Sequence, residues 1–155
     1  MLDDPQIVRT EAKQTAVIHL KVPRAEIQYV MGPAMEEVMA ALAAQGIEPV
    51  GPMFSNHYRL DPDYFDFEVG VPVEKPVSAT GRVRAGRLPE GTVVRTVYRG
   101  GYEGLGAAWG ELMAWIDAHG HETAPTFCES YAVGPESGGD PSTYQTELTR
   151  PLVVR

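Results

Sequence analysis

TAVIHLKV at residues 15–22 and TVVRTVY at residues 92–98 open two stretches of the chain that share one order of elements. In each stretch the apolar run leads to a helical pattern that ends at a glycine, Gly46 or Gly120, and then to two more strand-like runs. The two glycines are 74 residues apart, and other matching positions differ from this spacing by a few residues, as changes in loop length would give. The sequence therefore predicts a βαββ unit that is present twice.

The length of each copy indicates whether the two copies fold separately or as one domain. Neither copy, at roughly 75 residues, would bury a large core alone. We expect one α+β domain over residues 1–155, with repeats at about 6–76 and 80–155 that divide near Val77. This domain should have pseudo-two-fold symmetry, about eight antiparallel strands, two main helices and a ligand cleft between the halves.

Each copy is also expected to open with a hairpin. Alternating residues at 6–10 and 15–22 flank a polar turn at 11–14, and a second pair of runs flanks a tight turn at 88–91. Alternation of apolar and polar residues is typical of half-buried strands. We therefore predict that the strands joined by each turn pair with one another.

The composition narrows the possible partners and the cellular compartment. The net charge is −8, from 13 Lys and Arg against 21 Asp and Glu, so nucleic-acid binding is not expected and a charged partner should be a cation. The single cysteine, Cys128, has no second cysteine at metal-ligand spacing, and no cofactor is expected. There is no export signal and no apolar run of roughly 18 residues, so we expect a cytoplasmic protein without membrane association.

Several motifs in the second half occur in a familiar order and spacing: Leu88-Pro-Glu-Gly91, Arg99-Gly-Gly-Tyr102, Glu129-Ser-Tyr131 and Thr146-Glu147. This succession resembles the GyrI-like, or AraC-type effector-binding, superfamily. The resemblance implies a duplicated βαββ fold whose cleft binds small, often cationic and lipophilic molecules. One departure is Gly101, where many members have proline. Only about fourteen residues precede the first strong strand, too few for a helix-turn-helix domain, so we expect a stand-alone member.

Glu129 is the main candidate for ligand binding. It lies two residues from both Phe127 and Tyr131, and residues two apart on a strand share a face. A carboxylate among aromatic rings either takes up a proton or pairs with a cation. The resemblance implies that Glu129 reaches into the drug pocket. The alternatives are that it faces solvent or pairs with an arginine.

The remaining candidates come from both copies. Asn56 precedes Tyr58 as Glu129 precedes Tyr131, so we expect Asn56 to be the first-half counterpart of Glu129. Glu68 and Glu147 are expected to occupy equivalent places. The expected ligand-binding residues are Glu129, Tyr131, Tyr102, Trp109, Phe54, Asn56, Tyr58, Tyr98, Phe127 and Glu147, and no metal site is expected.

Three functions are compatible with this site. The first is a protein that binds a cationic or planar lipophilic, drug-like molecule through Glu129 and the aromatic rings. The second is a hydrolase that opens cyclopropane-bearing genotoxic natural products, with Glu129 activating a water molecule. The third is a gyrase-inhibitory protein-binding module, which the negative charge permits but does not specify.

Overall fold

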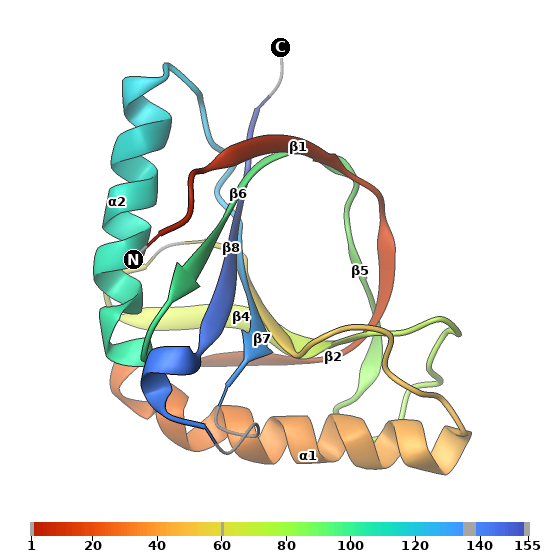
Figure 1. Cartoon of the computed structure of the whole chain (residues 1–155). Helices are drawn as coiled ribbons and strands as arrows, with labels where there is room; N and C mark the ends of the chain where they lie inside the picture. The colour runs from red at the N-terminus through yellow and green to blue at the C-terminus, as the bar shows by residue number, and fades with distance from the viewer. Residues whose placement is uncertain (1, 60, 135–138, 154–155) are drawn as a thin grey trace. The chain divides into compact units, whose positions relative to one another are not determined.

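The structure is a computed structural model that describes residues 2–59, 61–134 and 139–153 (Figure 1). The described residues form eight antiparallel strands and two α-helices, α1 (Ile27–Gln45) and α2 (Leu105–Ala118), with short 3-10 turns. The chain divides into two compact units, which we call unit 1 (Met1–Thr10 with Gly91–Arg155) and unit 2 (Glu11–Glu90). The predicted α+β fold with a duplicated set of elements is confirmed.

Unit 2 is a four-stranded sheet with α1 on one face. The strands are β2 (Lys13–Pro23), β3 (Phe54–His57), β4 (Tyr64–Pro72) and β5 (Arg84–Leu88), and they pair in the order β3-β4-β2-β5. The buried side of α1 includes Ala34, Val38 and Leu42, which belong to one cluster with Ile18 and Val69 of the sheet. Burial of this apolar stripe is what stabilises α1 against the sheet.

Unit 1 repeats this arrangement around α2. Its strands are β1 (Gln6–Thr10), β6 (Gly91–Arg99), β7 (Phe127–Val133) and β8 (Gln145–Pro151), in the order β1-β6-β8-β7. The buried residues of α2 are Ala108, Leu112 and Ile116, each 74 positions after its counterpart in α1. The two helix ends also match, because Gly46 and Gly120 both take positive φ, 68° and 71°.

The expected opening hairpins are wrong. Strand β1 pairs with β6, and β5 pairs with β2, so each sequence repeat contributes its first strand to the sheet of the other. The links between consecutive strands are Glu11-Ala12 and Pro89-Glu90. A two-residue hairpin turn needs positive φ at one or both residues, which glycine or asparagine supplies and these four residues do not. The chain therefore continues instead of reversing.

The strand register confirms one predicted equivalence and corrects another. With the 74-residue offset of the two helices, Asn56 corresponds to Ser130. Glu68 stands opposite Asn56 in unit 2, and Glu147 stands opposite Ser130 in unit 1, so the two glutamates are equivalent. In the same register Ser55 stands opposite Val69 as Glu129 stands opposite Leu148. The counterpart of Glu129 is therefore Ser55, and the expected match with Asn56 is wrong by one residue. A slip of one residue moves a side chain to the other face of a sheet.

Gly70 is where the packing of unit 2 leaves no room for a side chain. A Cβ at Gly70 would overlap the backbone oxygen of Ala16 and come within 2.8 Å of Val17. We expect Gly70→Ala to lower the free energy of unfolding by about 1–3 kcal/mol, because the neighbouring strand must shift. Gly106→Ala is the matched control, since nothing lies within 4 Å of that position and alanine favours a helix. Urea unfolding of both variants checks this, and equal stabilities would contradict it.

His57 makes the stability of unit 2 depend on pH. It is 3% exposed, its ring stacks on Phe67 at 4.9 Å, and its Nε2 lies 3.1 Å from Ser55 Oγ. Burial, and then the charge of Arg24, lower the pKa of His57 from 6.5 to about 4. The folded state therefore binds fewer protons than the unfolded state between these values. Stability from this group is complete above about pH 6.5 and is lost as the pH falls toward 4, by roughly 3 kcal/mol.

Urea unfolding between about pH 7 and pH 4.5 measures this effect in wild type and in His57→Gln. The carboxylates titrate in both proteins, so the difference between the two pH slopes isolates the histidine. We expect the variant to have the shallower slope, and parallel slopes would contradict the assignment.

Candidate functional site

Glu129 projects from β7 toward the face of the unit 1 sheet that α2 covers. Its direct partner on β8 is Leu148, a fully buried residue of the cluster beneath α2, and opposed residues share a face. The indole Nε1 of Trp109 donates a hydrogen bond to Glu129 Oε2 at 2.7 Å, and the hydroxyl of Tyr131 donates one to Oε1 at 2.8 Å. Each carboxylate oxygen thus has one neutral donor that fixes its position.

Further rings contact the rings of the two donors, Trp109 and Tyr131. The ring of Tyr102 lies 5.7 Å from that of Tyr131 and 5.3 Å from that of Tyr144, and Trp109 lies edge-on to Phe127 at 5.3 Å. Tyr102 is 37% exposed, and Glu129 is half-buried. We call this set the Glu129 cluster: Glu129, Tyr102, Trp109, Phe127, Tyr131 and Tyr144. It combines one carboxylate with ring faces, which is an arrangement suited to an aromatic cation.

Tyr98 contacts the loop that leads to Tyr102 of this cluster. Its side chain is buried, and its hydroxyl donates a hydrogen bond to the Gly101 carbonyl at 2.9 Å. A Cβ at Gly104 would overlap the same hydroxyl, and Gly100 has a φ of 143°. Tyr98 therefore shapes the glycine loop that carries Tyr102, which is a different role from the ligand contact that the sequence predicts.

Glu147 lies on the other face of the same sheet. It stands opposite Ser130 and Val97, one register position away from the pair that contains Glu129. Its Oε1 is 3.3 Å from the Nε of Arg95. Cys128 shares this face, and its burial raises the pKa of the thiol to about 12, so the reactive thiolate form is disfavoured. The structure does not bring Glu147 together with Glu129.

The predicted residues of the first half occupy the face of the unit 2 sheet that α1 does not cover. Phe54 and Asn56 stand opposite Gly70 and Glu68, and these positions alternate with the residues that pack on α1. Tyr58 lies on the same face. Its burial, and then a hydrogen bond with Glu68, raise the pKa of its hydroxyl to about 12.

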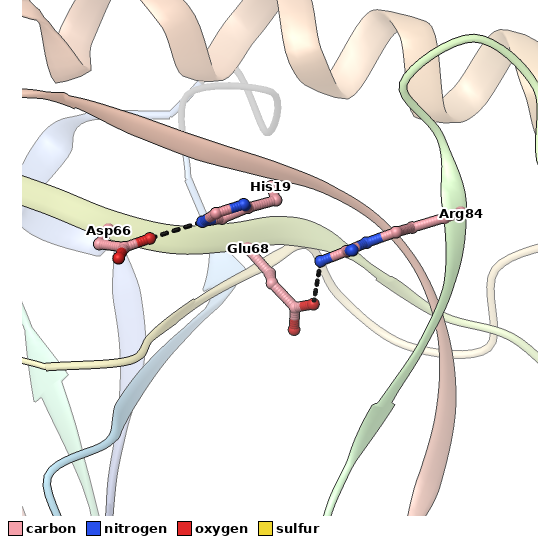
Figure 2. Close-up of polar contacts among 4 residues, drawn as sticks. All are labelled: His19, Asp66, Glu68 and Arg84. Carbon is pink, nitrogen blue, oxygen red and sulfur yellow. Dashed lines mark hydrogen bonds and ion pairs between the residues drawn. The ribbon is translucent and has the colours of Figure 1, made fainter.

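Figure 2 shows the polar groups around Glu68 on this face. His19 Nε2 lies 2.5 Å from Asp66 Oδ1, and Arg84 Nη2 lies 3.5 Å from Glu68 Oε2. Glu68 is 9% exposed and has an arginine partner, as Glu147 has in unit 1. These two equivalent glutamates are therefore paired carboxylates, in contrast to Glu129.

Two residues near the cluster were not among the expected ligand-binding residues: Tyr144, which directly precedes β8, and Arg150, which lies in β8. Tyr144 completes the aromatic contacts of Tyr102, and Arg150 lies over the ring of Phe127, with 5.8 Å between the guanidinium carbon and the ring centroid. The signal for Arg150 is its spacing, because it follows the buried Leu148 by two residues and shares its face. The family motifs of the second half do not include Arg150.

No group of three or more His, Cys, Asp or Glu residues in the described ranges is placed to hold a metal ion. Over the same residues, neither helix has the length and apolar character needed to cross a bilayer.

Removal of the Tyr98 hydroxyl should loosen the glycine loop. In Tyr98→Phe the Gly101 carbonyl loses its donor, and we expect the free energy of unfolding to fall by about 1 kcal/mol. Amide exchange of residues 100–104 should accelerate with it. Tyr64→Phe is the control, because Tyr64 is 43% exposed. Unchanged exchange in Tyr98→Phe would show that the hydroxyl does not hold the loop.

Comparison with known proteins gives a family and a set of related folds. The family model described as the GyrI-like small molecule binding domain matches residues 3–153. No curated protein matches the chain. The crystal structure of the EcmrR C-terminal domain has a TM-score of 0.86 and 20% identity, with 98% of each chain covered. In the EcmrR–DNA complex the TM-score is 0.84 at 21% identity, and this chain spans 57% of the length of the EcmrR chain.

Two further structures are similar at lower scores. SAV2435 bound to tetraphenylphosphonium has a TM-score of 0.65 and 13% identity, covering 97% of this chain and 94% of that one. A hydrolase encoded by lin2189 from Listeria innocua has a TM-score of 0.66 and 13% identity, covering 96% and 91%. At these identities the likeness establishes the fold.

Proposed function

The chain belongs to the GyrI-like small molecule binding domain family, and on that premise we propose that it binds a lipophilic aromatic cation at the Glu129 cluster. The observation that carries the proposal is the charge balance at Glu129. Both hydrogen-bond donors of this carboxylate, Trp109 and Tyr131, are neutral, and no arginine or lysine of the described residues forms an ion pair with it. A half-buried negative charge is thus left for a cation from outside the chain.

The contrast with the other two glutamates strengthens this argument. Glu68 and Glu147 each have an arginine within 3.5 Å, so their charges are already compensated. Glu129 has rings in place of an arginine, and a ring face attracts a cation through its quadrupole. A planar or multi-ring cation would satisfy the charge and cover the rings at the same time. The tetraphenylphosphonium in the SAV2435 structure is a cation of this kind.

The hydrolase alternative requires Glu129 to take part in proton transfer as well as to carry a charge. As a general base Glu129 would have to accept a proton from water. Each oxygen already accepts one hydrogen bond from a neutral donor, which occupies one of the two lone pairs with which it could accept a proton from water. This arrangement supports a binding role better than proton abstraction.

Tetraphenylphosphonium is a direct probe of the proposal. We expect the wild-type chain to bind it in an isothermal titration, and Glu129→Gln to bind it at least about tenfold more weakly, because the amide keeps the shape and loses the charge. Glu147→Gln is the matched control. It makes the same change in the same sheet, on the face away from Trp109, and should leave the affinity unchanged.

Equal losses in the two variants would mean that the effect is the net charge of the protein and not the site. Wild-type affinity in Glu129→Gln, or no binding to the wild type, would contradict the proposed function.

A further inference from the structure

Arg150 is a half-buried cation that has no counter-ion among the described residues, and it lies close to the Glu129 cluster. Its Nε is buried and has no hydrogen-bond partner, and its Nη2 reaches only the Thr123 hydroxyl, at 3.3 Å. No carboxylate in the described residues pairs with it. Burial lowers the pKa of Arg150, because it removes the charged group from water.

Contacts connect Arg150 to Glu129 without neutralising either. The guanidinium lies over the ring of Phe127, Phe127 lies against Trp109, and Trp109 donates to Glu129. Glu129 and Arg150 are on the same face, because their partners Leu148 and Val94 are both buried beneath α2. Such diagonal positions on adjacent strands are roughly 7–8 Å apart, and in the described residues Glu129 accepts from Trp109 and Tyr131 instead of Arg150.

We propose that Arg150 is an anion subsite of the Glu129 cluster, so that the preferred ligands are aromatic zwitterions with a cationic group at Glu129 and a carboxylate at Arg150. The edge of a guanidinium formed by Nε and Nη2 matches the two oxygens of a carboxylate. In this chain that edge carries one donor without a partner and one with a long contact, and a ligand carboxylate would satisfy both. This inference rests on the proposed function.

Two dyes with the same ring system test the anion subsite at Arg150 separately from the cation site at Glu129. Rhodamine 123 is a cationic methyl ester, and rhodamine 110 is the corresponding free acid, which is a zwitterion at neutral pH. We expect fluorescence anisotropy to show that the wild type binds the acid about tenfold more tightly than the ester. Arg150→Gln should remove this preference by weakening the acid alone, and Arg150→Lys should retain part of it.

Arg95→Gln is the matched control, because Arg95 pairs with Glu147 on the opposite face and should not affect the preference. Circular dichroism establishes that each variant is folded, and binding of the ester reports whether the site is intact. If the wild type binds the ester at least as well as the acid, or if Arg150→Gln keeps the preference, the subsite is refuted while the cation site stands. If the wild type binds neither dye, both proposals fail.

Discussion

The alternation of side chains along a strand is the constraint on which the site depends. On β7 it directs Phe127, Glu129 and Tyr131 toward α2, and on β8 the same alternation places Glu147 on the reverse face. Trp109 can reach Glu129 only because the register sets that residue opposite Leu148. A change of one position would bring Cys128 or Ser130 under the helix and leave Trp109 without an acceptor. Packing, charge and hydrogen bonding at this site thus follow from one register.

Features with a local cause could be predicted from the sequence. The two helices follow from apolar residues at three- and four-residue spacing, and their ends follow from Gly46 and Gly120. The shared face of Glu129 and Tyr131 follows from their two-residue separation, and the hydrogen bond between them is a consequence. The sequence placed Trp109 and Glu129 together among the expected ligand-binding residues. It could not predict the hydrogen bond between them, because that bond depends on how α2 lies on the sheet.

The errors have long-range causes. The match of Asn56 with Glu129 rested on the spacing of Tyr58 and Tyr131, whereas strand register is set by pairing with β4 and β8. The glycine spacing of 74 residues would have identified Ser55 instead. The exchange of β1 and β5 was missed because alternating patterns mark strands without naming their partners. Glu147 was expected to bind the ligand together with Glu129, because similarity between the two repeats does not show which face of the sheet a strand residue takes.

The exchange of first strands changes how the chain is best divided. Thr10 and Gly91 are direct partners in the ladder between β1 and β6, and the hydroxyl of Thr10 donates to the Gly91 carbonyl at 3.1 Å. The chain therefore leaves unit 1 at Thr10 and returns to it at the adjacent Gly91, after the 80 residues of unit 2. In the order of the chain, unit 2 occupies the place where a short loop could join β1 to β6. The unit that holds Glu129 is thus discontinuous in sequence, and its first strand comes from the beginning of the chain.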